Sequence, residues 1–82
     1  MPFQVVITRD PVSRAWITKR SDVPGLAMHD KSSVKLRERL RRVIPYLLRI
    51  NNVEAGPENE LEIITYDRDR ADVIREHFTL GT

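Results

Sequence analysis

The chain has 82 residues and a mass of 9.6 kDa; 32% of the residues are charged, 40% are hydrophobic, and the formal net charge is +2. This size predicts a single domain over residues 1–82, and the apolar content excludes a disordered chain. The absence of cysteine excludes disulfides and thiolate metal sites. The sequence contains no run of about 18 apolar residues, which is the length that a membrane-spanning helix needs. Since the N-terminal segment also lacks a signal-peptide layout, we expect a soluble cytoplasmic protein.

The two parts of the chain carry opposite charge. Residues 1–50 contain eleven Lys and Arg against four acids, a net charge of +7, whereas residues 51–82 contain three Arg against eight acids, a net charge of −5. Such asymmetry indicates either a charged partner or neutralisation of one part by the other across the fold.

The chain begins with a predicted hairpin. Residues 3–9 and 14–20 alternate in hydrophobicity as strands do, and the Asp-Pro pair between them favours a turn. After a turn-rich segment, residues 26–29 predict a short third strand. We expect Trp16 to be buried beneath a helix.

A long helix is the clearest element. Ser32 is a candidate N-cap, and the helix is expected to end near Ile50, before Asn51 and Asn52. Val34 and Leu48 fall outside the predicted core stripe, which suggests a contact surface. The stripe itself consists of Leu36, Leu40, Val43, Ile44, Leu47 and Ile50.

The acidic segment 53–82 predicts a strand over 61–66 and a short helix over 71–78, because Ala71, Ile74 and Phe78 share one helical face. The order β-β-β-α-β-α predicts an α+β domain with the long helix on one face of a mainly antiparallel sheet.

The second sheet face needs a cover of its own. Either Ile74 and Phe78 fold back over it, or a second subunit covers it, and we expect a homo-oligomer with Trp16, Val6 or Leu48 as anchors.

Catalytic chemistry finds little support in the sequence. His29 and His77 stand far apart without a metal-ligand spacing, and segment 67–71 lacks the glycine and glutamate of a calcium loop. Ser32 and Ser33 are better explained as helix-capping residues. We therefore predict no enzyme activity, no catalytic residue, no cofactor and no metal.

The exposed face of the long helix is basic. Three interpretations stay open: neutralisation by solvent or by the acidic segment, contact with a protein partner, and binding of nucleic acid. The candidate contact residues lie close together around the helix: Lys35, Arg39, Arg42, Arg49 and Tyr46.

Three segments together resemble the HicB-like antitoxin domains, specifically their small stand-alone branch. They are Trp16-Ile17-Thr18, the segment Ser21 to Leu26 (SDVPGL), and the helix end Pro45-Tyr46-Leu47-Leu48 with Asn51-Asn52 after it. The similarity spans about residues 3–52. It implies a β-β-β-α-β fold in which the motif positions shape the structure: Trp16, Ser21, Asp22, Pro24, Gly25 and Leu26.

The resemblance also implies a function without catalysis. HicB-type antitoxins bind a small basic mRNA-cleaving toxin, and longer members add a DNA-binding domain, for which the residues after Asn52 leave too little room. The acidic segment 54–76 would be the electrostatic complement of such a toxin. We therefore expect an antitoxin of a type II toxin–antitoxin system. The alternatives are a small RNA- or DNA-binding module using helix 32–50, an enzyme with an unseen site, and an inactive oligomeric scaffold.

Overall fold

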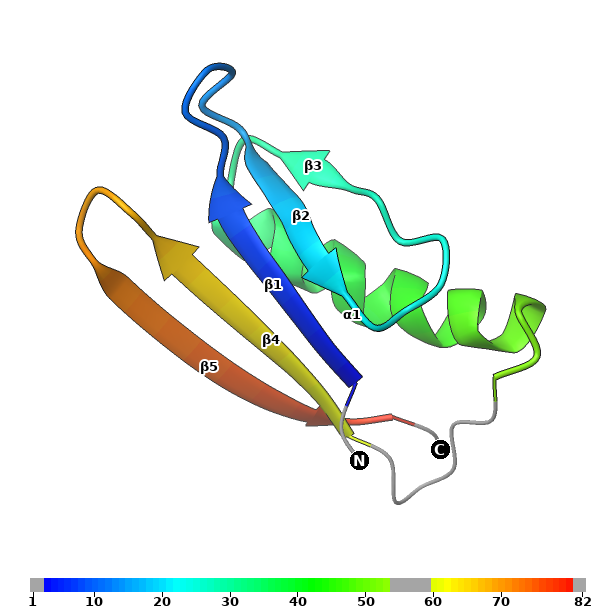
Figure 1. Ribbon diagram of the computed structural model, residues 1–82. Helices are drawn as coiled ribbons and strands as arrows, with labels where there is room; N and C mark the ends of the chain where they lie inside the picture. Colours follow the sequence, from blue (N-terminus) through cyan, green and yellow to red (C-terminus); the bar gives the residue numbers. More distant parts are fainter. Residues whose placement is uncertain (1–2, 54–59, 81–82) are drawn as a thin grey trace.

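A computed structural model describes residues 3–53 and 60–80. A five-stranded sheet has the order β3-β2-β1-β4-β5, and one helix, α1, connects β3 to β4 in sequence (Figure 1). The elements are β1 (Phe3–Arg9), β2 (Trp16–Ser21), β3 (His29–Asp30), α1 (Ser33–Ile50), β4 (Glu60–Asp67) and β5 (Asp72–Thr79). β1 and β4 pair in parallel and the other three pairings are antiparallel. The predicted α+β class, with the helix on a mainly antiparallel sheet, is confirmed.

Helix α1 begins and ends as the sequence predicts. The side chain of Ser32 accepts a hydrogen bond from the amide of Lys35 (3.3 Å), which satisfies one of the free donors of the first turn. At the other end, the Asn51 amide donates to the Leu47 carbonyl oxygen (3.1 Å), and Asn52 adopts a left-handed conformation (φ 57°).

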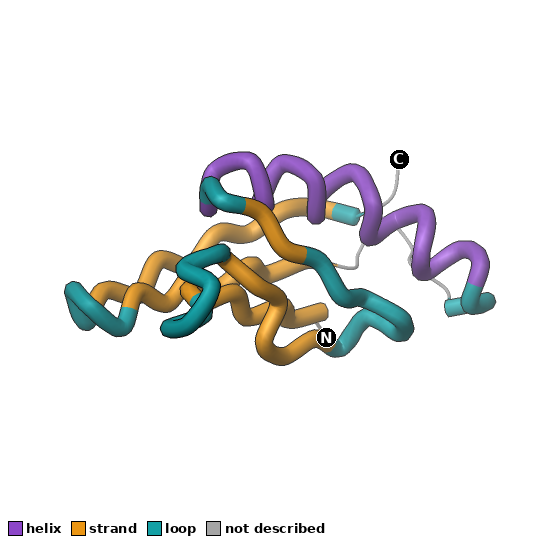
Figure 2. Tube along the Cα trace, turned by 90° about the horizontal axis from the view of Figure 1, so that it is seen from above, coloured by secondary structure: helices purple, strands orange, loops and turns teal. Residues whose placement is uncertain are grey.

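The core lies between α1 and one face of the sheet, as Figure 2 shows from above. Trp16 is buried there, as predicted. Leu48 is also buried, so its predicted place on a contact surface is wrong, and Ile50, predicted to face the core, is 54% exposed. The contact follows the row of every fourth residue (Leu36, Leu40, Ile44 and Leu48), and the last turn of α1 extends past the strands (Figures 1 and 2).

The short C-terminal helix predicted over 71–78 is wrong, because these residues form strand β5 at the edge of the sheet. Ala71 closes the β4–β5 turn with φ 53°, and β5 then pairs with β4 along its whole length. Residues four apart, such as Ile74 and Phe78, share a face in a strand as well as in a helix, so their spacing did not separate the two.

The third strand is shorter and later than predicted. It contains only His29 and Asp30, whereas Leu26 lies in the preceding loop and packs partly buried against the core. Between β1 and β2 the register shifts after Val6, which leaves Lys19 as an extra residue on β2.

Candidate partner-binding surfaces

The sheet has two faces, and α1 covers only one of them. Val5 and Ile7 of β1 and Leu61 and Ile63 of β4 point toward α1 and are fully buried. Their neighbours along each strand therefore point to the opposite face. Among residues 3–53 and 60–80, no helix or loop packs over that face, which we call the uncovered face (Figure 2).

The pairing register arranges the uncovered face in three rows across the strands. The first row is polar, and the second has apolar side chains between two arginines. The third is mostly apolar. In order, the rows are Gln4–Glu62–His77, Arg20–Val6–Ile64–Arg75, and His29–Ile17–Thr8–Tyr66–Val73.

A buried carboxylate anchors the polar row. Glu62 is only 6% exposed, and the side-chain amide of Gln4 donates to its Oε1 at 2.8 Å. His77 Nε2 lies 3.1 Å from Glu62 Oε2, and Arg75 Nη1 lies 3.5 Å from Glu62 Oε1. Three strands thus share one charge cluster, which fixes the polar end of the uncovered face.

The other two rows expose apolar surface. Tyr66 is 39% exposed and Val73 is 53% exposed, and Val6, Ile17 and Ile64 are partly exposed beside them. An apolar patch flanked by charged residues is typical of a protein interface.

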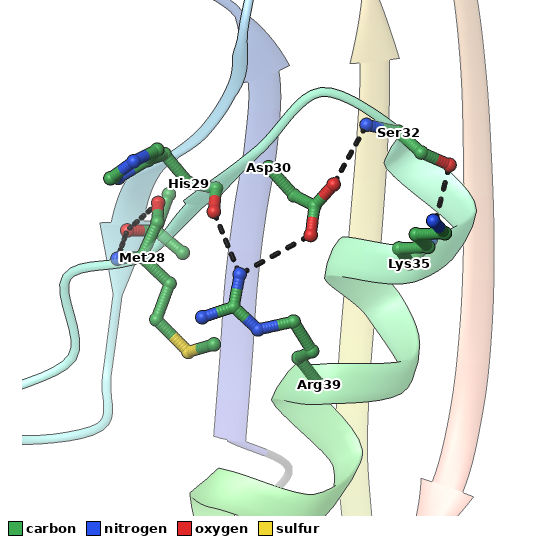
Figure 3. A network of polar contacts seen from close by, with 7 residues as sticks. Met28, His29, Asp30, Ser32, Lys35 and Arg39 are labelled. Carbon is green, nitrogen blue, oxygen red and sulfur yellow. Dashed lines mark hydrogen bonds and ion pairs between the residues drawn. The ribbon is translucent and has the colours of Figure 1, made fainter.

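The sequence predicted a role for the exposed face of α1, and the structure divides its residues. Arg39 is committed to the fold, since its Nη1 donates to the His29 carbonyl oxygen (2.9 Å) and lies 3.3 Å from Asp30 Oδ2 (Figure 3). Lys35, Arg42 and Arg49 form no ion pair within the described ranges, and Arg49 lies over the ring of Tyr46 at 6.0 Å.

Arg37 and Arg41 are two further basic side chains of α1, and both contact strand β5. Arg37 Nε lies 2.8 Å from Glu76 Oε1 of β5, and the guanidinium of Arg41 lies over the ring of Phe78 at 4.2 Å. Arg14, between β1 and β2, forms an ion pair with Asp69, between β4 and β5 (3.3 Å). Part of the charge asymmetry in the sequence is therefore cancelled by contacts between the basic and acidic segments. Glu54 and Glu58 of the acidic segment lie outside the described residues.

The motif residues between β2 and β3 build a turn. The Ser21 hydroxyl oxygen accepts a hydrogen bond from the backbone amide of Val23 (2.9 Å), and Asp22 Oδ2 accepts one from the backbone amide of Gln4 (2.9 Å). Pro24 is exposed, and Gly25 has φ 75°, which favours glycine. Trp16 lies in the core at the start of β2, where Arg9 covers its ring at 5.0 Å.

Two aspartates hold turns and have pKa values below the ordinary 3.8. For Asp30 the main cause is the hydrogen bond from the Ser32 amide (3.0 Å to Oδ1), and for Asp10 it is the hydrogen bond from the Ser13 amide (2.8 Å). Within the described residues, no group of three His, Asp or Glu side chains is placed to hold a metal ion. No helix there is long and apolar enough to cross a membrane.

The cluster at Glu62 was missed at the sequence level. The signal was present, because Glu62, Ile64 and Tyr66 alternate with the buried residues of β4. A partly polar second face could have been inferred from this alternation, but the parallel β1–β4 pairing that brings Gln4 beside Glu62 could not.

The comparison with known families is consistent with one domain type over most of the chain. The family described as "Domain of unknown function (DUF1902)" matches residues 3–74. No curated protein and no solved structure matches the chain. Because the match covers strands β1 to β4, helix α1 and the beginning of β5, the chain belongs to the DUF1902 family.

Proposed function

We propose that this protein is a HicB-like antitoxin, or a descendant of one, that binds and neutralises a small basic ribonuclease toxin in the bacterial cytoplasm. It acts by stoichiometric binding and performs no chemistry of its own. The motif similarity of residues 3–52 supports this function, and so does the order β1-β2-β3-α1-β4, which is the order that the resemblance implies.

The uncovered face is the proposed toxin-binding surface. It has an apolar centre at Val6 and Ile64, and arginines stand at both ends of the same row. Burial of such a patch by a partner supplies the apolar contact that dominates protein–protein affinity. Ile64 lies on β4 beside Val6 of the central strand β1, so a partner seated on this face would bury both side chains.

Acidic side chains supply the complement to a basic toxin. Glu62 and Glu76 are engaged with arginines of their own chain, but Glu60 and Asp72 are exposed and form no ion pair within the described residues. Glu60 lies at the start of β4 and alternates with Glu62 on the uncovered face, whereas Asp72, at the start of β5, points to the helix side. Charges at the rim of an interface raise association rates and improve specificity.

We expect an adjacent reading frame to encode a small basic protein, and the test is co-expression with that protein. The neighbouring protein alone should arrest growth and cleave mRNA, and co-expression of this chain should restore growth. The two proteins should co-purify in a fixed ratio that high salt and nuclease treatment leave intact. Growth arrest that persists despite equal expression of this chain would show that it is not the antitoxin.

Self-association is part of the same proposal. In the absence of a toxin, the uncovered face of one chain would pack against that of a second copy, as an isologous interface does. Val6 remains an anchor, whereas Trp16 and Leu48 are buried in the core and are unable to serve as anchors. Ile74 and Phe78 lie on the helix side of β5, so they do not cover the uncovered face. Light scattering should give a mass above 9.6 kDa that decreases on dilution and with added toxin.

A second candidate function is binding of RNA or DNA along α1. The observation that favours it is the stripe formed by Lys35, Arg42 and Arg49, which lacks ion pairs in the described part of the chain. Such binding should weaken steeply with salt, and replacement of these three residues by Glu should abolish it. An affinity that responds to neither change would exclude this candidate.

A further inference from the structure

The two edges of the sheet differ in how they are protected against pairing with another chain. At one edge, β3 contains only two residues, and Lys19 is the extra residue where the β1–β2 register shifts. Short edge strands, bulges and lysines are the usual devices that prevent edge pairing. At the other edge, β5 pairs with β4 over eight residues without a register shift and contains neither proline nor lysine (Figure 1). Among the described residues, β4 is the only strand that pairs with β5, so the outer side of β5 is open.

The helix side of this open edge carries apolar side chains that α1 covers incompletely. Ile74 and Phe78 both point to the helix side of β5, and Ile74 is 50% exposed. Beside Phe78, a groove of about 580 Å³ lies between α1 and the end of β5, and Pro45, Leu61 and Arg42 are among the residues that line it. The edge therefore has an exposed apolar side chain near one end and a partly apolar groove at the other.

We propose that β5 pairs antiparallel with β5 of a second copy about a two-fold axis at Glu76. Ile74 of each chain then lies opposite Phe78 of the other, at the mouth of the groove, as in cross-strand pairs within one sheet. An axis at Arg75 would instead place Ile74 opposite Glu76, and an axis at Ile74 would place Asp72 opposite Glu76. The axis at Glu76 is the register that joins apolar to apolar.

The charges on the helix side fit the same register. Asp72 falls opposite Leu80 of the second copy, beside the groove that Arg42 lines, and neither Asp72 nor Arg42 forms an ion pair within residues 3–53 and 60–80. In one chain, Asp72 begins β5 and Arg42 lies near its other end, so these two charges can meet only between chains. The two Glu76 carboxylates meet at the axis, where Arg37 of the same chain neutralises each at 2.8 Å.

This edge interface is separate from the uncovered face and does not depend on the proposed function. It is isologous, because the same strand is used by both copies. The two sheets become one continuous sheet, with both α1 helices on one side and both uncovered faces on the other. The edge-paired dimer would therefore present two uncovered faces side by side.

Cross-linking tests the register directly, because the chain contains no cysteine. Glu76→Cys places a thiol opposite its own copy at the axis, at a separation that suits a disulfide. Mild oxidation of this full-length variant should therefore give a covalent dimer. Asp72→Cys is the matched control, since it also replaces an acid on the helix side of β5 but would lie roughly 27 Å from its copy. It should stay uncrosslinked, whereas equal cross-linking of both variants overturns the proposal.

Charge reversal gives a second measurement if Glu76→Cys fails to fold. Asp72→Arg and Arg42→Asp should each weaken the dimer by about fivefold or more in sedimentation experiments, and the double variant should recover the affinity. Because the two charges meet only between chains, recovery identifies the β5 edge. A double variant as weak as the single variants overturns the proposal.

Two lysine substitutions separate the edge from other surfaces. Ile74→Lys should weaken the dimer by about tenfold or more, while Ile50→Lys, at a residue that is 54% exposed on the last turn of α1, should leave it unchanged. Ile64→Lys alters the uncovered face and should leave the Glu76→Cys cross-link intact. Equal effects of Ile74→Lys and Ile50→Lys, or loss of the cross-link in Ile64→Lys, would contradict pairing through β5.

Discussion

The two faces of the sheet are built from the same strands and differ in what covers them. On β4, Ile63 points toward α1 and is fully buried, whereas its neighbour Ile64 points to the uncovered face and stays partly exposed. The same division holds on β1 between Val5 and Val6. Adjacent residues of one type thus have two environments, because one is buried in the core and the other is partly exposed to solvent.

The uncovered face of β1 and β4 is apolar at Val6 and Ile64 although it also carries the polar Gln4 and Glu62. A sheet with one solvated face usually alternates apolar and polar residues, and near-continuous apolar runs mark strands that are buried on both faces. β1 and β4 follow the second pattern around Val6 and Ile64, but one helix covers only one face. The partner proposed above would supply the second cover.

The largest expected effect compares the two isoleucines of β4 directly. Ile63→Ala should lower the free energy of unfolding by about 3 kcal/mol, because it opens a cavity beneath α1. Ile64→Ala should cost about 1 kcal/mol or less in the isolated chain, since its side chain already reaches solvent. Urea unfolding of the monomer measures both. Equal losses would mean that the two faces are equally buried.

A smaller effect is expected where the helical cover begins. Ser32→Ala removes the side-chain acceptor of the Lys35 amide and should cost about 1 kcal/mol of folding free energy. Ser33→Ala, one residue later, keeps that acceptor and serves as the matched control. Thermal unfolding of both variants at neutral pH checks the difference, and an equal loss in both would show that Ser32 does not act as the cap.

The smallest effect depends on pH. The pKa of Asp30 lies below 3.8 in the folded protein, so its carboxylate stabilises the fold above that pH, and this contribution is lost as the pH falls through the folded-state pKa. Asp30→Asn should therefore flatten the decline in stability below about pH 4. Unfolding curves of the wild-type protein and the variant at pH values from 2 to 6 measure it. An unchanged slope in Asp30→Asn would contradict the assigned role.

Helix α1 and the strands β1, β2 and β4 are predicted well from the sequence. Alternation identifies β1, β2 and β4, and the cap at Ser32 together with the apolar stripe identifies α1, because these signals are local. The fifth strand was predicted as a helix, since Ile74 and Phe78 satisfy both periods and only pairing with β4 decides between them.

The candidate sites depend more on contacts between distant residues. Arg39 looked free in the sequence, but the carbonyl oxygen of His29 and the carboxylate of Asp30 engage it across the β3–α1 connection. Likewise, Trp16 and Arg9 meet only through the β1–β2 register. The sequence shows which side chains are charged, whereas contacts between distant residues determine which of them remain free to bind a partner.

The most direct test of the uncovered face is the affinity of the purified protein for the proposed toxin partner, measured by calorimetry for two variants. Ile64→Lys places a charge at the centre of the uncovered face and should weaken binding by about 30-fold or more, as loss of a central interface residue does. The triple replacement of Lys35, Arg42 and Arg49 by Glu changes only the exposed side of α1, and should leave the affinity within about threefold. The opposite result, tight binding by Ile64→Lys and loss of binding by the triple variant, would place the partner on the helix and contradict the account.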